Sequence, residues 1–300
     1  MLVLVAKVLV RPLTDCIAPP LTSKVLKYCL EGVVPRKVLN GLSNTSISML
    51  FDGSRPLYST TQSENPIRLR AGKTYTGRVS VIDSTPEFLE RVSSSGLASF
   101  LCTSTYGRFA VEFVEFSVVT LESLDIDLPV NFKISFLTPT VLSSKLMSPP
   151  PLARKVSSMH KLIPQPSLIF SHLLKMWNTF AEPEHKIGKQ SEWAPYILGR
   201  QVDLVLAELD YRIKPETVIV GKDEKERLRK ARGFTGWVIY KSIAKPKFHK
   251  TIAKLLALAE LTGVGRSRGI GLGHIAITGL TTKSPKTEQT SPENSLSSRR

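Results

Sequence analysis

The chain has 300 residues, of which 42% are hydrophobic and 22% charged, so it can bury one large core or two smaller ones and is not disordered as a whole. Its 41 Lys and Arg residues outnumber 25 Asp and Glu residues, and the net charge of +16 favours a polyanionic partner, nucleic acid before an acidic membrane. No apolar run approaches the roughly 18–20 residues of a membrane helix. The apolar residues 1–10, interrupted by Lys7, predict a buried strand rather than a signal peptide.

The cysteines and histidines bear on redox compartment and metal binding. Cys16, Cys29 and Cys102 are odd in number, far apart and never in a C-x-x-C pair. This pattern argues against a disulfide framework and a zinc site, and favours a reducing cytoplasm. The five histidines form no metal-binding motif, so we expect no metal and no other cofactor.

The first part of the chain reads as strand, helix, strands, helix, strands. Apolar runs and turn residues predict strands at 2–10, 46–51, 55–59, 74–82, 97–103 and 108–121, and helices at 22–30 and 85–96. In the first helix, the apolar residues Val25, Leu26 and Cys29 share one face. Lys24, Lys27, Tyr28 and Glu31 line its polar flank.

The same order recurs after a turn-like stretch at 124–129. We expect strands at 130–138, 202–213, 234–243 and 273–278, a loop at 149–151, and helices at 167–180 and 247–261. This is the βαββαβ order of a ferredoxin-like unit, so the predicted fold class is α+β with two tandem ferredoxin-like (RRM-like) domains. We assign residues 1–125 and 126–278 to these domains, and residues 279–300 to a disordered tail.

The basic surplus is concentrated near the C-terminal end. Residues 222–268 contain 13 Lys or Arg and 4 Asp or Glu, and Lys225, Arg227, Arg229, Lys230 and Arg232 lead directly into a predicted strand. A basic stretch that enters a hairpin can follow a phosphate backbone, although a solvated surface loop explains it equally well. The strand aromatics Phe234, Trp237 and Tyr240 can stack on bases, but single strand aromatics more often belong to the core.

Five glycines lie between the last predicted helix and the last strand: Gly263, Gly265, Gly269, Gly271 and Gly273. A dinucleotide fingerprint follows a strand and opens a helix, which is the reverse order, and a phosphate-binding P-loop needs G-K-[ST] after its glycines. We therefore predict a loop whose backbone N–H groups face phosphate, with Arg266 and Arg268 supplying charge. The alternative is a helix cap followed by a turn.

The run AELTGVGRSRGIGLG at 259–273 resembles the signature loop of the CRISPR repeat-processing endoribonucleases, the sixth family of CRISPR-associated proteins. Residues 233–238, 136–140 and 171–180 are also similar to segments of that family. The resemblance covers most of residues 130–278, and over 1–125 it rests mainly on topology.

The resemblance implies a metal-independent cut in a CRISPR repeat transcript, in which a 2′-hydroxyl attacks the adjacent phosphate and leaves a 2′,3′-cyclic phosphate. The alternative is a non-catalytic repeat-RNA-binding subunit of a CRISPR effector complex. Contact with effector subunits and a homodimer both stay open, and no membrane partner is expected. A plain RRM-type RNA binder ranks last, because strands 2–10 and 74–82 lack the required aromatic and basic alternation.

Much of that family is expected to use a histidine near the first helix, whereas the first histidine here is His160. We therefore assign charge stabilisation to Lys24 and Lys27, and proton transfer to Tyr28 or to a lysine of lowered pKa. Arg232 and Arg268 would reach in from the second domain. The predicted RNA-binding residues are the five loop glycines and Lys37, Lys225, Arg227, Arg229, Lys230 and Arg266. The alternative for Lys24 and Lys27 is a solvated helix face.

Overall fold

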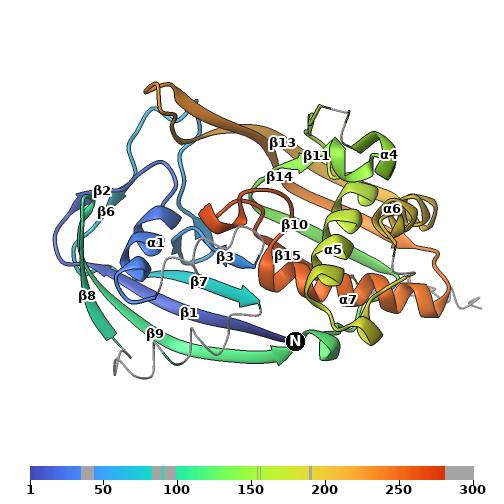
Figure 1. The fold of residues 1–300 in the computed structure, drawn as a ribbon. Helices are drawn as coiled ribbons and strands as arrows, with labels where there is room; N and C mark the ends of the chain where they lie inside the picture. Colours follow the sequence, from blue (N-terminus) through green and yellow to red (C-terminus); the bar gives the residue numbers. More distant parts are fainter. Residues whose placement is uncertain are drawn as a thin grey trace, which may run out of the picture.

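A computed structural model describes residues 1–34, 44–82, 90, 99–153, 155, 157–188 and 191–280 (Figure 1). Three predictions lie outside these residues: the helix at 85–96 apart from Glu90, the RNA contact at Lys37, and the tail from residue 281 onward. Among the described helices, none combines the length and the apolar character needed to cross a bilayer.

The N-terminal unit is an antiparallel sheet with helix α1 (Ser23–Glu31) on it (Figure 1). Its strand order is β5-β4-β7-β1-β9-β8, and β3 also pairs with β7. The strands are β1 (Leu2–Pro12), β3 (Thr45–Ile47), β4 (Phe51–Asp52), β5 (Arg55–Pro56), β7 (Tyr75–Ile82), β8 (Ser99–Ser104) and β9 (Gly107–Thr120). A separate small pair joins β2 (Cys16–Ile17) to β6 (Arg68–Leu69).

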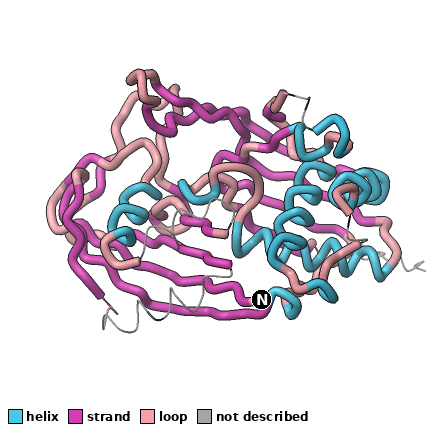
Figure 2. The backbone as a smooth tube through the Cα atoms, viewed as in Figure 1, coloured by secondary structure: helices cyan, strands magenta, loops and turns pink. Residues whose placement is uncertain are grey.

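The C-terminal unit is a four-stranded antiparallel sheet in the order β13-β14-β10-β15. Its strands are β10 (Asn131–Thr140), β13 (Leu206–Lys222), β14 (Leu228–Ser242) and β15 (Ile275–Gly279), and its main helices are α5 (Pro166–Phe180), α6 (Ala194–Val205) and α7 (Pro246–Thr262). Figure 2 shows that most of the helical backbone gathers on this unit. Phe234 and Tyr240 are fully buried in its core, which confirms the core alternative for these two aromatics.

Both sheets have the ferredoxin-like strand order. In the N-terminal unit β9, β1, β7 and β3 lie side by side, and in the C-terminal unit β15, β10, β14 and β13 do the same. In each unit the first strand is central and pairs with the last one, which is the arrangement that a βαββαβ chain adopts when its helices cover one face. The predicted fold class is therefore confirmed.

Two local predictions are wrong in the C-terminal unit. Residues 202–205, expected in a strand, are the last turn of α6, and residues 150–151 of the loop expected at 149–151 begin the short helix α4 (Pro150–Ala153). Helix α6 packs against α5 at Gly199, where an added Cβ would lie 2.4 Å from Ser171 Oγ. The apolar run that follows these residues is typical of a strand. The contact with α5, which places them in a helix, leaves no pattern in the local sequence.

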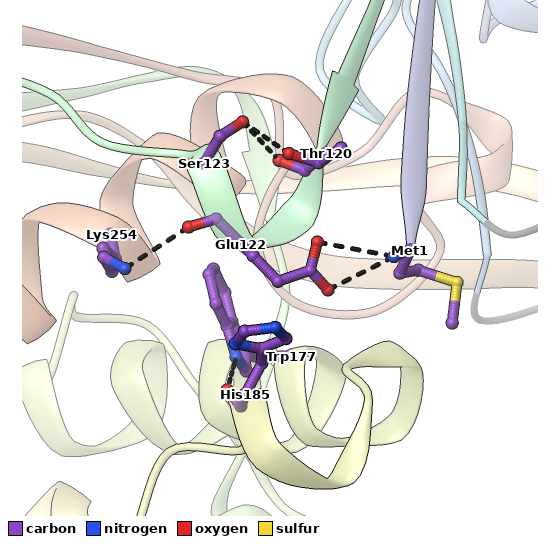
Figure 3. Close-up of polar contacts among 7 residues, drawn as sticks. All are labelled: Met1, Thr120, Glu122, Ser123, Trp177, His185 and Lys254. Atoms are coloured by element: carbon purple, nitrogen blue, oxygen red, sulfur yellow. Dashed lines mark hydrogen bonds and ion pairs between the residues drawn. The ribbon is translucent and has the colours of Figure 1, made fainter.

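The connection between the units is held by Glu122, in the short 3-10 helix η1 (Leu121–Ser123) (Figure 3). Its carboxylate accepts a hydrogen bond from the Met1 ammonium at 3.2 Å, and Lys254 Nζ of α7 donates to its backbone oxygen at 3.4 Å. Burial by itself raises the pKa of Glu122, but the hydrogen bonds from its own backbone and from Met1 lower the pKa overall. Glu122 thus contacts Met1, just before β1, through its carboxylate, and α7 through its backbone oxygen.

A disulfide between Cys29 and Cys102 joins the end of α1 to β8, with a Cα–Cα distance of 5.3 Å. The expectation from cysteine spacing that no disulfide forms is therefore wrong. The two cysteines are 73 residues apart, and only the packing of β8 beside α1 brings them together. The third cysteine, Cys16, is free.

Removal of this disulfide is expected to lower the free energy of unfolding by about 4 kcal/mol, because the cross-link restricts the unfolded chain over a long loop. The measurement is urea unfolding of Cys102→Ser and of the parent protein, each with and without dithiothreitol. Cys16→Ser is the control and should unfold like the parent. A reductant effect of equal size in Cys102→Ser and in the parent would contradict the assignment.

Candidate active site

A small apolar cluster, separate from the main hydrophobic cores, lies where the two units meet. Leu21 and Met49 come from the N-terminal unit, and Val141, Val218 and Leu272 come from the C-terminal unit. All five side chains are buried, with at most 3% exposed. Leu21 lies two residues before α1 and Leu272 lies in the glycine-rich loop, so this cluster fixes the start of α1 against that loop.

The glycine-rich loop, residues 263–273, is folded tightly on itself. Val264 N–H donates to Gly273 O at 2.8 Å, and Gly273 N–H donates to Pro139 O at 3.0 Å. Gly273 has a φ of +75°, and a Cβ at this residue would lie 1.9 Å from Val264 O. Only glycine fits this approach of two backbone segments.

The predicted phosphate-facing role of the loop glycines needs a correction. The N–H groups of Gly263, Gly271 and Gly273 donate to backbone oxygens of the protein itself, and these three residues and Gly265 are buried. Gly269 is the half-buried one. The glycines therefore shape the loop, which matches the alternative of a cap and turn more closely than a row of free N–H donors.

The two arginines of the loop have different surroundings, since Arg268 is buried and Arg266 is exposed. Arg268 is only 5% exposed, and its Nη1 donates to Thr262 O at 3.1 Å. Burial lowers the pKa of Arg268 to about 10. Arg266 is exposed, and its Nη1 lies 3.5 Å from His160 Nε2. The placement of Arg268 supports a positioning role inside the loop, whereas Arg266 is open to a ligand.

Helix α1 begins where the loop and the hairpin β13–β14 converge. Ser23 Oγ donates to Ile270 O of the loop at 2.5 Å. Lys24 Nζ lies 3.6 Å from the position that a Cβ of residue 221 in β13 would take. Burial lowers the pKa of Lys24, and the nearby Lys27 lowers it further. Lys24 is thus half-buried between elements of both units, beside a second ammonium group.

Tyr28, the third residue predicted on α1, is near the C-terminal end of the helix. Tyr28 is 46% exposed and lines a hollow with residues of β8 near the Cys29–Cys102 disulfide. The structure therefore brings Lys24 and Lys27 together, whereas Tyr28, one helical turn after Lys24, lines the hollow beside β8.

The hairpin β13–β14 projects past its own sheet and over the N-terminal unit (Figure 1). Thr61 N–H donates to Thr217 O of β13 at 2.8 Å, and Tyr58 OH donates to Glu216 at 2.7 Å. The predicted basic residues Lys225, Arg227, Arg229, Lys230 and Arg232 are all exposed on its distal part. The last three lie within β14, which begins at Leu228 and not, as predicted, at residue 234.

Arg78, which the sequence analysis did not single out, links β7 through its side chain to the end of α7 and to His274. Arg78 Nη2 of β7 donates to Glu260 O at the end of α7 at 2.6 Å, and lies 3.2 Å from His274 Nδ1. Burial, and next the charge of Arg78, lower the pKa of His274 to about 3, so the imidazole is neutral and accepts the hydrogen bond. No local motif marks Arg78, because its partners lie more than 180 residues away in the chain.

Comparisons with known proteins agree with this architecture. The family profile of the Cas6 N-terminal domain matches residues 4–119, and that of CRISPR-associated endoribonuclease Cas6 matches residues 134–275. A Saccharolobus solfataricus protein named CRISPR-associated endoribonuclease Cas6 1 is 30% identical over 280 residues, which cover 89% of this chain and 93% of that protein. The chain belongs to the Cas6 family. A second relative from the same organism, named CRISPR-associated endoribonuclease Cas6 2, is 28% identical over 285 residues, again 89% and 93% of the two chains.

Solved Cas6 structures share the fold at low sequence identity. A Cas6 product complex superposes with a TM-score of 0.60 at 16% identity, covering 92% of this chain and 99% of the other. Thermus thermophilus Cas6 gives a TM-score of 0.55 at 18% identity, with the same coverage. The Cas6 fold is therefore kept here although most side chains differ.

Proposed function

We propose that this Cas6-family chain processes CRISPR repeat RNA by a metal-independent cut, in which the 2′-hydroxyl attacks the adjacent phosphate and leaves a 2′,3′-cyclic phosphate and a 5′-hydroxyl. Two relatives that match nearly the whole chain are named CRISPR-associated endoribonucleases. One Cas6 of the same fold is known both as a product complex and as a substrate mimic complex. RNA cleavage is therefore the activity that the relationship supports.

The observation that carries the mechanism is the placement of Lys24. Its ammonium is half-buried at the meeting point of α1, the glycine-rich loop and the basic hairpin, beside Lys27. A cation in a partly water-excluded position stabilises the charge that develops on a pentacoordinate phosphate, and a lowered pKa helps it to pass a proton to the leaving oxygen. We assign both tasks to Lys24, with Lys27 as a second source of positive charge.

Cleavage of labelled repeat RNA by the purified protein in excess EDTA tests the proposal. We expect a single cut that is blocked when the nucleotide 5′ of the cut carries a 2′-deoxy sugar, because the attacking oxygen is then missing. A cut that survives the deoxy substitution, or that needs added metal, would refute the mechanism. Tight binding without any cut would instead assign the chain to the non-catalytic repeat-RNA-binding class.

The basic hairpin is expected to follow the RNA backbone. Substitution of Arg229 and Lys230 by alanine should weaken repeat-RNA binding and reduce the steepness of its salt dependence by about 0.7 logarithmic units per lost phosphate contact on single strands. Binding is measured by fluorescence anisotropy across a range of salt concentrations. The pair Lys245→Ala/Lys247→Ala, two exposed lysines at the start of α7, removes the same charge elsewhere and is the control. An equal change of slope in both variants would contradict a specific role of the hairpin.

A further inference from the structure

A second concave surface lies on the C-terminal unit, on the other side of the glycine-rich loop from α1. It has a volume of about 790 Å³ and is formed by α5, the start of α6, the 3-10 helix η2 (Ser144–Met147) and Arg266 of the loop. This volume falls within the range of small-molecule sites and accommodates one nucleotide. We refer to it as the α5–α6 hollow.

The α5–α6 hollow carries cations that the protein does not neutralise. Lys145, Lys175 and Arg266 line it, and Glu192 is the acidic residue among its lining side chains. Within the described part of the chain, none of the three cations forms an ion pair with a carboxylate. The hydroxyl groups of Ser143 and Ser158 lie among them and hydrogen-bond each other at 2.6 Å, which leaves one hydroxyl proton of the pair to donate. The lining therefore suits a phosphodiester, which needs positive charge and a hydrogen-bond donor together.

His172 is a second observation that points to a ligand in the α5–α6 hollow. It lines the hollow from α5, and its buried Nε2 has no hydrogen-bond partner among the described residues. Burial, and then the charges of Arg268 and Lys175, lower the pKa of His172 to about 3, so the ring is neutral. Buried polar atoms in native proteins are nearly always paired, and an unpaired one in a hollow marks a place where a ligand atom can bind.

The hollow also offers an aromatic surface. Tyr196 of α6 lines it, and Trp193 packs against Tyr196 edge to face, with ring centroids 5.9 Å apart. An aromatic ring beside a cluster of cations is the usual arrangement for an unstacked base and its phosphate. A base held within a double helix cannot enter a concave site of this kind, so the chemistry favours a single-stranded nucleotide.

The position of Arg266 connects the hollow to the candidate active site. Its backbone N–H donates to Val141 O at 3.0 Å, which holds the loop at the edge of the hollow. Four residues further on, Ile270 O accepts the hydrogen bond from Ser23 at the start of α1. One loop therefore contacts both the hollow and the start of α1.

We propose that the α5–α6 hollow binds one nucleotide of single-stranded RNA, with its phosphate at Arg266 and Lys175 and its base against Tyr196. The proposal rests on the proposed function for its choice of ligand, and it adds a binding site away from Lys24. His172 supplies a neutral donor or acceptor to the bound nucleotide.

The test compares Arg266→Ala/Lys175→Ala with the control Lys245→Ala/Lys247→Ala, which removes the same charge from exposed positions on α7. The probe is a short single-stranded RNA from the repeat, and binding is measured by fluorescence anisotropy at several salt concentrations. We expect the first variant to bind about tenfold or more weakly and to lose about one unit of salt slope, while the control stays near the parent protein. Tyr196→Ala should weaken binding by roughly tenfold through lost stacking, and Tyr196→Phe should not.

Equal affinities and equal salt slopes in Arg266→Ala/Lys175→Ala and in the control would overturn the proposal. Adenosine monophosphate is titrated in parallel, and its binding in the hollow without any loss of RNA affinity in the variant would refute RNA as the ligand. The cleavage rate at saturating protein is measured on the same preparations. Failure of the parent protein to cleave refutes the proposed function alone, whereas a change in affinity reports on the hollow.

Discussion

Lys24→Ala is expected to slow single-turnover cleavage of repeat RNA by about 10²–10³-fold at saturating protein, while the Kd for the RNA changes by less than about tenfold. The physical reason is that a half-buried cation acts mainly on charge that develops during the reaction, whereas the exposed hairpin cations supply most of the binding. Single-turnover kinetics and a binding titration of the same variant separate the two effects. Lys247→Ala is the control for the loss of a lysine charge.

A rate loss in Lys24→Ala that is matched by an equal loss of affinity would contradict this assignment, because it would reduce Lys24 to a binding contact. Unchanged cleavage in Lys24→Ala would instead support the alternative in which Lys24 and Lys27 lie on a solvated helix face without a catalytic role. Lys24→Arg separates charge from proton transfer, since arginine keeps the charge but does not give up a proton near neutral pH. A strong loss in this variant supports proton transfer.

The pH dependence of cleavage follows from the lowered pKa of Lys24. The proposed role needs the protonated amine, so activity is retained below that pKa and falls as the pH rises through it. Because the charge of Lys27 contributes to the shift, Lys27→Ala should raise the pKa of Lys24 and move the alkaline limb of the rate profile to higher pH. A rate that instead increases with pH through this limb would identify Lys24 as a base.

Gly273→Ala is expected to reduce the free energy of unfolding by about 3–5 kcal/mol, or to prevent folding, since strain and a backbone clash add together. The new Cβ would meet Val264 O at 1.9 Å, at a φ of +75° that disfavours alanine. Urea unfolding monitored by tryptophan fluorescence measures the loss.

Gly72→Ala is the matched control for Gly273→Ala. Gly72 has nearly the same φ, +72°, but no atom lies within 4 Å of its Cβ position. The control therefore carries only the backbone strain of a left-handed alanine, about 1 kcal/mol. Losses of similar size at the two positions would show that the loop yields to the added methyl group, and would contradict the structural role of Gly273.

Much of the fold could be predicted because its signals are local. The apolar face of α1, with Val25, Leu26 and Cys29, is buried as its helical spacing predicts. The alternation of strands and helices was sufficient to recognise two ferredoxin-like units, since this order allows few sheet topologies. The residue pattern of the signature loop is enough to identify the family, because it lies within one short segment of the chain.

The candidate site was predicted only in part. The α1 lysines were singled out by their spacing on one helix flank, and the structure places Lys24 at the junction. The same spacing selected Tyr28, which faces a different hollow, because helical periodicity does not show what packs at each end of a helix. The glycines were correctly recognised as special, but their purpose depends on backbone atoms of distant segments such as Pro139.

By itself, the sequence determined the order of the elements that make up the two sheets, the fold class, the family and the concentration of positive charge, because each of these follows from composition or from patterns within a few tens of residues. The tertiary structure alone decided which cations converge and which glycines are enclosed. It also decided that Cys29 lies beside Cys102 and that Arg78 reaches the end of α7. These contacts join residues far apart in the chain, and their energies depend on distance and burial in space, which no local pattern records.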